Sequence, residues 1–232
     1  MPHFDLALVL HGQYHDWLIS GLLVSLELAG VTLVCALPLA AGIALLRLAP
    51  NAALRWLGAI YVEAIRNVPL LAHLLFWYFG VSALLPDRVN TALNESGRME
   101  FLSAAIALTL YTAAYMAEDI RSGIRAIPVV QFEAARALGF GFIATMRRII
   151  LPQALRVTVP PLISQTLNLW KDTSIATVIG VAEMMYQAAR VESASFRSAE
   201  AFAFATTAYL AVSLAITGLA SWYHQRYPVR TL

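Results

Sequence analysis

The chain has 232 residues, of which 59% are hydrophobic and 13% are charged. Soluble domains usually carry about a quarter charged residues, so this composition excludes an ordinary soluble domain and indicates a membrane protein. The net charge of +2 comes from basic residues spread among loops, which argues against a nucleic-acid-binding surface. Cys35 is the single cysteine, so neither a disulfide framework nor a cysteine-based metal site is available.

Residues 1–17 form a polar, aromatic-edged segment without the basic n-region of a cleavable signal peptide and without paired metal-ligand spacing. We expect a surface segment here, followed by one membrane domain over residues 18–232. A helix needs about 20 apolar residues to cross about 30 Å of hydrocarbon, and five segments approach that length. They are residues 18–46, 57–84, 101–117, 158–182 and 201–223. The sequence therefore predicts an all-α polytopic membrane protein with about five transmembrane helices.

Basic residues in the connections set the predicted direction of insertion. Ten lie on one side of the five spans and four on the other. The ten are Arg47, Arg55, Arg121, Arg125, Arg136, Arg147, Arg148, Arg156, Arg226 and Arg230, and the four are Arg88, Arg98, Arg190 and Arg197. The positive-inside rule then places the N-terminus outside and the C-terminus in the cytoplasm. Residues 1–17 are therefore expected to be extracytoplasmic.

The second span contains Glu63, Arg66 and Asn67. A charge at mid-bilayer costs about 2.5 to 3.5 kcal/mol, so these side chains should face protein or water. Spacings of three and four residues place them on one helix face, where they can satisfy one another as a structural group. The alternative is that they line a water-filled path. Pro69 would weaken the backbone ladder and could kink the span.

The connection of about residues 118–156 is too long for a structureless loop. Apolar side chains recur along it at helical spacing, which predicts one amphipathic face. They are Ala135, Leu138, Phe142, Met146 and Ile149. Gly139 and Gly141 interrupt this pattern, so we expect two short helices that meet at a glycine turn. The element could lie on the inner leaflet, with Arg147 and Arg148 near anionic lipid, or it could bind a cytoplasmic protein.

The fourth span is interrupted by Pro160 and Pro161 and by the polar tetrad at 171–174. Lys171 and Asp172 are adjacent and point about 100° apart on a helix, so they cannot simply pair. With Thr173 and Ser174 they predict an unwound or cavity-lining point. The tetrad could serve a path or gate, or it could contact a second subunit. Glu27 in the first span and Glu183 near the outer end of the fourth are weaker candidates.

One motif narrows the choice for the long connection. Glu133, Ala134 and Ala135 are followed after three residues by Gly139, and after nine more by Ile149, Ile150, Leu151 and Pro152. This spacing resembles the cytoplasmic signature of permease subunits of ATP-binding cassette importers. The stretches YVEAIRNVPLL at 61–71 and NLWKDTSIATVIGVAEM at 168–184 resemble the polar amino acid permeases. The residues DTS with YQAAR at 186–190 are most similar to glutamate and aspartate permeases.

The resemblance implies a type I importer permease in the bacterial inner membrane. An external binding protein would deliver the amino acid, two permease subunits would form the path, and two ATPases would bind ATP and Mg. This chain would hold no cofactor. The coupling residues would be Glu133, Ala134, Ala135, Gly139, Ile149, Leu151 and Pro152. Substrate-path candidates are Glu63, Arg66, Asn67, Lys171, Asp172, Thr173 and Ser174, with Arg66 suited to an amino acid carboxylate.

ATP hydrolysis is expected to belong to another chain. Lys171 is the only lysine and follows Trp170, so no GxxxxGK[ST] phosphate loop exists here. No nucleophile constellation is present either, which predicts a subunit that is not an enzyme. Two alternatives remain: a permease for another polar or basic amino acid, or a membrane scaffold that binds a cytoplasmic partner without moving substrate. The second permease could be an identical or a related chain.

Overall fold

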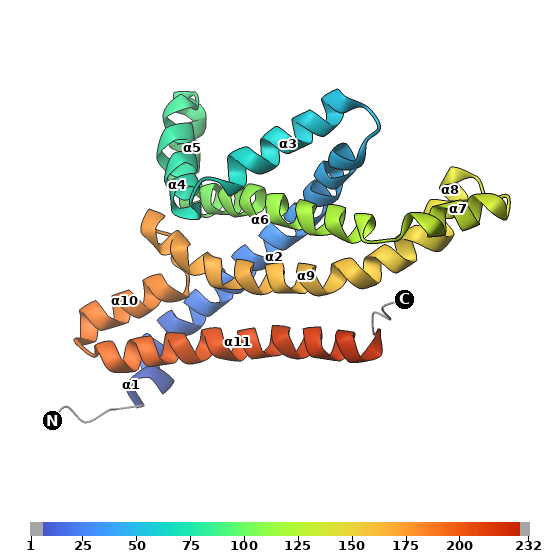
Figure 1. The fold of residues 1–232 in the computed structure, drawn as a ribbon. Coiled ribbons are helices and arrows are strands. Elements are labelled where there is room, and N and C mark those ends of the chain that lie inside the picture. The colour runs from blue at the N-terminus through green and yellow to red at the C-terminus, as the bar shows by residue number, and fades with distance from the viewer. Residues whose placement is uncertain (1–6, 228–232) are drawn as a thin grey trace.

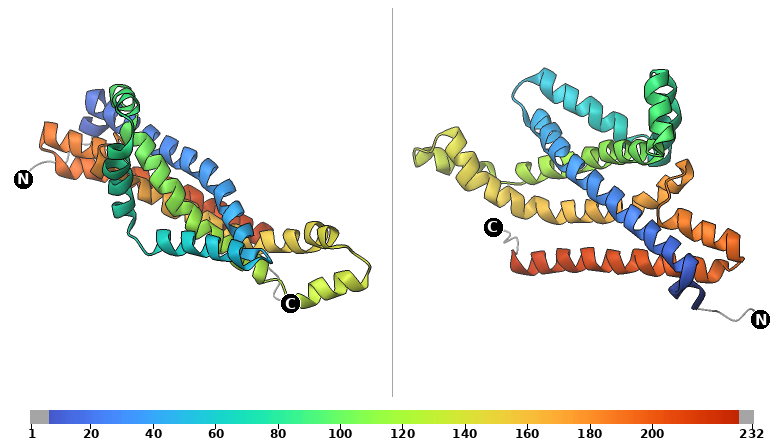
Figure 2. Two further views of the ribbon diagram at one scale, coloured as in Figure 1. Left: turned by 90° about the horizontal axis from the view of Figure 1, so that it is seen from above. Right: turned by 180° about the vertical axis from the view of Figure 1, so that it is seen from behind.

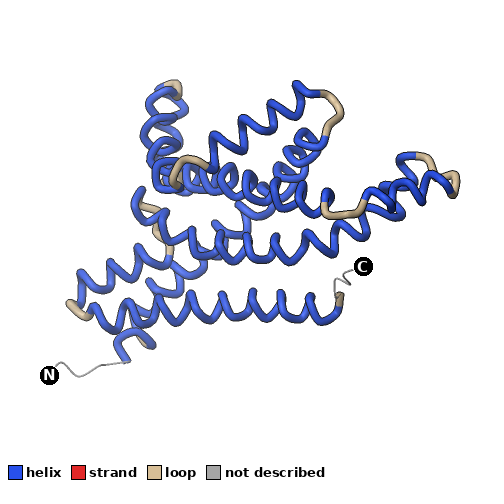
Figure 3. Tube along the Cα trace, viewed as in Figure 1, coloured by secondary structure: helices blue, strands red, loops and turns tan. Residues whose placement is uncertain are grey.

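The computed structural model describes residues 7–227, and every regular element in that range is helical (Figure 3). The first half contains α1 (Ala7–Leu10), α2 (Gly12–Leu48), α3 (Ala52–Arg66), α4 (Leu70–Leu75), α5 (Asp87–Glu95) and α6 (Met99–Arg125). The second half contains α7 (Val129–Ala137), α8 (Phe142–Thr145), α9 (Leu151–Asp172), α10 (Met184–Ser195) and α11 (Ser198–Arg226). Short π-helical segments cover Phe76–Val81 and Met146–Ile150, and 3₁₀ segments cover Ser82–Leu84 and Thr173–Ile179. The all-α prediction is confirmed.

The long helices build an elongated bundle, in which α6 packs on α2 and α9, and α9 packs on α11 (Figure 1). Leu28 of α2, Leu108 of α6 and Leu169 of α9 meet in the central core. Small residues let the helix backbones approach closely, as Ala36 of α2 and Ala113 of α6 do in a second cluster. The helix α1 and the C-terminal end of α11 lie at opposite ends of the bundle (Figure 2).

The predicted second span is two helices rather than one kinked helix. α3 ends at Arg66, α4 begins at Leu70, and the two are bent by 99°. Pro69 caps the start of α4, because its fixed φ suits a helix N-terminus and it lacks the N–H that a continuous helix would need. Pro69 was expected to weaken the backbone ladder and possibly kink the span, and the structure has a full break with a new helix start at this point.

The predicted fourth span is more continuous than expected at its two prolines. α9 continues without a break through Pro160 and Pro161, so the expected interruption there was wrong. The prolines at 160 and 161 remove the N–H groups that would donate to the carbonyls four residues earlier, and a helix packed among neighbouring helices tolerates this loss. The change from α to 3₁₀ geometry comes at Thr173, inside the polar tetrad.

Three helices of the described part, α2, α6 and α11, are long and apolar enough to cross a membrane, and the bent pair of Ala52–Arg66 and Leu70–Leu84 would add a fourth. α9 is not among them, since Arg156, Gln165 and Lys171 make it more polar. The count of five spans and the direction of insertion stay predictions. α2 already begins at Gly12, within the segment 1–17, whereas residues 1–6 and 228–232 lie outside the described part.

Candidate transport path and coupling element

The candidate coupling element, residues 126–150 and called the coupling element below, projects beyond the end of the bundle (Figures 1 and 2). Its first helix, α7, ends where Gly139 adopts φ +79°. The Gly139 N–H donates to the Arg136 carbonyl and the Phe140 N–H donates to the Ala135 carbonyl, each at 3.0 Å. This pair of bonds is a Schellman motif, and its left-handed position favours glycine. The predicted glycine turn between two short helices is confirmed.

The residues of the motif divide between a buried root and an exposed surface. Ala135 and Ile150 are buried, and Ile150 packs with Ile127 and Ala154 where the element joins α9. Ile149 packs beside this cluster. The motif residues Glu133, Ala134, Gly139, Leu151 and Pro152 are exposed. The motif thus fixes the element at one edge and leaves the other edge open.

The predicted single apolar face does not exist. Leu138 and Phe142 are 76% and 75% exposed, whereas Met146 and Ile149 pack against the buried root. The turn at Gly139 reverses the chain between Leu138 and Phe142, so helical spacing cannot be carried across it.

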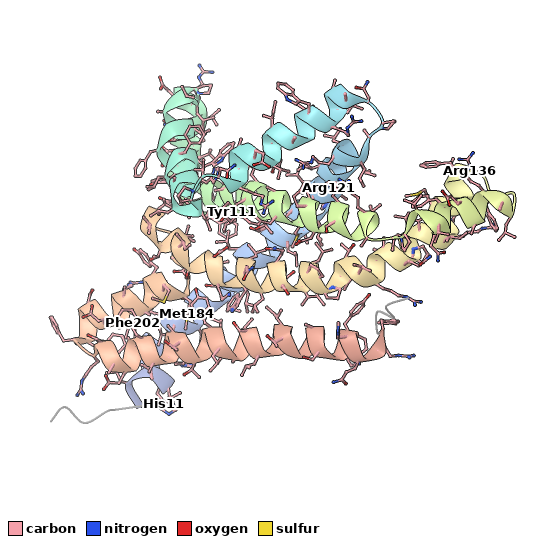
Figure 4. All side chains as sticks on the ribbon, viewed as in Figure 1. His11, Tyr111, Arg121, Arg136, Met184 and Phe202 are labelled. Carbon is pink, nitrogen blue, oxygen red and sulfur yellow. The ribbon has the colours of Figure 1, made fainter. Side chains whose placement is uncertain are left out.

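A pocket of about 340 Å³ lies between α6 and α9. Tyr111, which lines it, lies on α6 (Figure 4). The lining residues are Tyr111, Thr112 and Tyr115 from α6 and Gln165, Asn168, Leu169, Lys171 and Asp172 from α9. Its volume is at the lower end of the range for small-molecule sites. Two of the predicted path residues, Lys171 and Asp172, therefore line this pocket.

The other two residues of the tetrad, Thr173 and Ser174, hydrogen-bond to the backbone of α9. Thr173 is fully buried and donates to the Trp170 carbonyl at 2.8 Å. Ser174 donates to the Lys171 carbonyl at 2.7 Å. These hydroxyls satisfy backbone carbonyls at the point where α9 changes to 3₁₀ geometry, which holds Lys171 and Asp172 at the pocket.

The predicted group in the second span is only partly brought together. Asn67 donates to the Glu63 carboxylate at 3.0 Å, but Arg66 lies instead over the Tyr115 ring, 4.8 Å from its centroid. Tyr115 is hydrogen-bonded to Tyr111 at 3.3 Å, and both line the pocket. Arg66 therefore reaches the edge of the pocket through a cation–π contact from the break between α3 and α4.

Glu183 is fully buried, at the start of α10 and outside the helices long enough to span a membrane. It accepts from the Tyr186 N–H at 2.9 Å, the Tyr209 hydroxyl at 2.9 Å and the Ser25 hydroxyl at 3.2 Å. Burial raises the pKa of this carboxyl, against the hydrogen bonds that lower it. Glu183 thus ties α2, α10 and α11 together and does not line the pocket, whereas Glu27 is exposed on α2.

Sequence reasoning missed Tyr111, Tyr115, Gln165 and Asn168 as pocket residues. A signal was available, because Gln165, Asn168 and Asp172 recur at spacings of three and four and so share one helix face. Among residues 7–227 no group of three or more His, Cys, Asp or Glu side chains could hold a metal.

The family model described as binding-protein-dependent transport system inner membrane component matches residues 36–228. The chain belongs to this family. Its permease relatives include a probable glutamine ABC transporter permease of Bacillus subtilis, which is 37% identical and aligns over 92% of this chain and 90% of its own length. A glutamate/aspartate import permease of Escherichia coli strain K12 is 35% identical over 86% of this chain and 82% of its own.

The fold agrees with this membership. A solved amino acid ABC transporter with histidines matches with a TM-score of 0.81 and 30% identity, over 92% of this chain and 95% of the other. Permease subunits of this family are not catalytic, because ATP hydrolysis belongs to a separate subunit. The chain is accordingly a multi-pass inner-membrane permease of amino acid ABC importers.

Proposed function

We propose that the pocket between α6 and α9 is part of the translocation path of this permease and that glutamate or aspartate is the substrate. The proposal rests on the charged residues that line the pocket. One cation and one anion, Lys171 and Asp172, are adjacent at a cavity of about 340 Å³. A free amino acid carries one carboxylate and one ammonium, so this pair matches its two backbone charges.

The side chain of the substrate would meet a different part of the lining. Gln165 and Asn168 offer amide donors, and Arg66 adds a cation beyond Tyr115. These donors suit the second carboxylate of glutamate or aspartate. Glu63 and Asp172 offset part of the positive charge, so the amides also suit glutamine, which the name of one relative favours.

The coupling element would bind the cytoplasmic ATPase. Its exposed edge carries Glu133, Ala134 and apolar Leu138 and Phe142, and no described residue of this chain covers the last two. Its buried root, Ile150 with Ala154, is continuous with α9. Because α9 also carries Lys171, a movement of the element would be transmitted along one helix to the pocket.

The assembly would contain two ATPase copies, a second permease that is this chain or a related one, and an extracytoplasmic binding protein. ATP and Mg would bind to the ATPase. The first 17 residues would lie on the outer side with the binding protein, and the coupling element on the inner side.

The direct test is uptake of radiolabelled glutamate by proteoliposomes that contain the permease, its ATPase and its binding protein. We expect unlabelled aspartate to compete, and glutamine, histidine and arginine to compete weakly. Lys171→Gln should lower uptake by about 10- to 100-fold, because a charge-assisted hydrogen bond of about 1.5 to 3 kcal/mol is lost.

The matched control is Lys171→Arg, which keeps the charge and should retain most of the uptake. Preferential competition by glutamine would reassign the substrate. If an assembled complex with active ATPase moves none of the five amino acids, the path proposal fails and the scaffold alternative takes its place.

A further inference from the structure

A second pocket opens where α2 ends, α3 begins and α6 ends. Its volume is about 370 Å³. Four of its lining residues are arginines, namely Arg47, Arg55, Arg121 and Arg125. The remaining described lining residues are Trp56 and two alanines, so none is acidic. The pocket therefore presents a concentrated positive charge.

This charge is only partly neutralised from behind. Arg47 and Arg121 both contact Glu118, at 3.3 Å and 2.6 Å. The Nη1 group of Arg55 donates hydrogen bonds to the carbonyls of Ala49 and Pro50, at 3.1 Å and 2.7 Å. One carboxylate thus serves two guanidinium groups, and the neutral carbonyls add no charge. Net positive charge remains at the pocket.

One donor of an arginine that lines the pocket has no acceptor among the described residues. Nη1 of Arg47 is buried and has no hydrogen-bond partner among the described residues. The stem of Arg47 lies against Gly58 of α3, where a Cβ atom would come within 3.1 Å of Arg47 Cγ. Because buried donors are normally paired, this nitrogen would be stabilised by an acceptor, such as a phosphate oxygen, that enters the pocket.

The surroundings of the pocket indicate what kind of molecule would bring that phosphate. α2 and α6 both have the length and apolarity of membrane spans, and the pocket lies at their ends. Figure 4 shows Arg121 on α6 in the angle below α3. Trp56 and Leu57 beside it are 69% and 57% exposed. A tryptophan next to arginines at a span end is typical of the lipid headgroup level, and basic pockets between spans bind anionic headgroups.

We propose that this pocket binds the phosphodiester headgroup of an anionic membrane lipid. Arg55 and Arg125 bind the phosphate from the open side, Arg47 donates from within, and Trp56 lies against the glycerol and acyl boundary. The proposal does not depend on which amino acid the permease carries.

Native mass spectrometry of the detergent-purified permease–ATPase complex, titrated with phosphatidylglycerol or phosphatidylcholine, tests this. Arg55→Gln/Arg125→Gln should bind phosphatidylglycerol about 25-fold more weakly, at about fivefold for each arginine near an anionic headgroup. Arg125→Gln alone keeps the Arg55 contacts to the turn and should weaken binding about fivefold. Arg47 and Arg121 are left intact because their loss would strand Glu118.

The matched control is Arg156→Gln/Arg226→Gln, which removes two exposed arginines from outside the pocket and changes the net charge equally. It should bind phosphatidylglycerol like the wild type. Equal weakening in both double variants, or equal binding of phosphatidylcholine, would overturn the proposal. Displacement by millimolar inorganic phosphate would show a site for the free anion. Lipid binding to the permease alone that is lost in the complex would assign the surface to the ATPase.

Discussion

The coupling element and the α6–α9 interface are joined by α9 but are built in opposite ways. In the element, the side chains of Leu138, Phe142 and Ile143 are 76%, 75% and 79% exposed. At the interface, Gly123 of α6 and Thr158 of α9 are buried, and the two helices touch through them. The element has apolar surface that no described residue of this chain covers, whereas the Gly123–Thr158 contact is closed by the chain itself. Substitutions should therefore act on partner binding at the exposed edge of the element and on folding at the Gly123–Thr158 contact.

The largest expected effect on stability is at the interface. A Cβ atom at Gly123 would overlap Thr158 Oγ1 and lie 3.1 Å from Thr158 Cβ, so Gly123→Ala should separate α6 from α9. Overpacking of this kind costs about 1 to 3 kcal/mol. Thermal unfolding of the purified permease in detergent measures this loss.

Gly42→Ala is the control, since Gly42 lies inside α2 with nothing within 4 Å of the added Cβ. It should be neutral or slightly stabilising, because alanine favours a helix more than glycine. Equal destabilisation by the two substitutions would mean that the α6–α9 contact is not what makes position 123 sensitive.

The coupling element should respond to Gly139→Ala, but locally. Alanine at φ +79° costs about 1 to 2 kcal/mol, and this strain falls on the turn between α7 and α8 rather than on the bundle. We expect faster amide exchange at residues 133–140 with little change in global unfolding. Gly141 has φ −69°, so Gly141→Ala should leave exchange unchanged. Similar exchange in both variants would argue against the left-handed turn.

Phe142→Ala tests the exposed edge. We expect the stability of the free permease to change by less than about 0.5 kcal/mol, because the side chain is exposed. Affinity for the ATPase should fall about tenfold, as expected when an aromatic anchor of an interface is truncated. Phe196→Ala, at an 87% exposed position between α10 and α11, should leave that affinity unchanged. Unchanged binding by Phe142→Ala would remove this edge from the interface.

The smallest effect is expected at Glu183, which lies outside the coupling element and does not line the pocket. Burial raises the pKa of its carboxyl above the ordinary value of 4.5, against opposing hydrogen bonds. The stability from the neutral carboxyl is then present below pH 4.5 and is lost as pH rises through the raised folded pKa. Glu183→Gln cannot lose a proton, so its stability relative to wild type should rise from pH 5 to pH 8. If the unfolding temperatures of wild type and Glu183→Gln change in parallel from pH 5 to pH 8, the raised pKa of Glu183 is contradicted.

The sequence could predict what depends on local spacing. The glycine turn follows from Gly139 after a short helical pattern, and the change of geometry at Thr173 follows from a polar tetrad in an apolar run. The 99° bend before Leu70 could not be derived, because Pro69 is compatible with both a kink and a fresh helix start. The contact of Arg66 with Tyr115 joins residues 49 positions apart, and helical spacing carries no information about such pairs.

The same distinction explains the candidate site. Lys171 and Asp172 were predicted because charges in a span are costly, whereas the pocket also needs Tyr111 and Tyr115, which look like ordinary apolar-span residues. Glu183 was a candidate for the same reason, but it is hydrogen-bonded within the fold. Its partners Ser25 and Tyr209 come from helices distant in the sequence, so this pairing could not be predicted.

The most direct test of the account is amino-acid-stimulated ATP hydrolysis by the complete transporter in nanodiscs, measured with Glu133→Lys. Glu133 is exposed on α7, so the substitution should leave the permease folded. We predict that stimulation is lost, while Glu95→Lys, an equal charge reversal on exposed α5, retains it. Full stimulation in Glu133→Lys would contradict the claim that the coupling element transmits the action of the ATPase to α9 and the pocket.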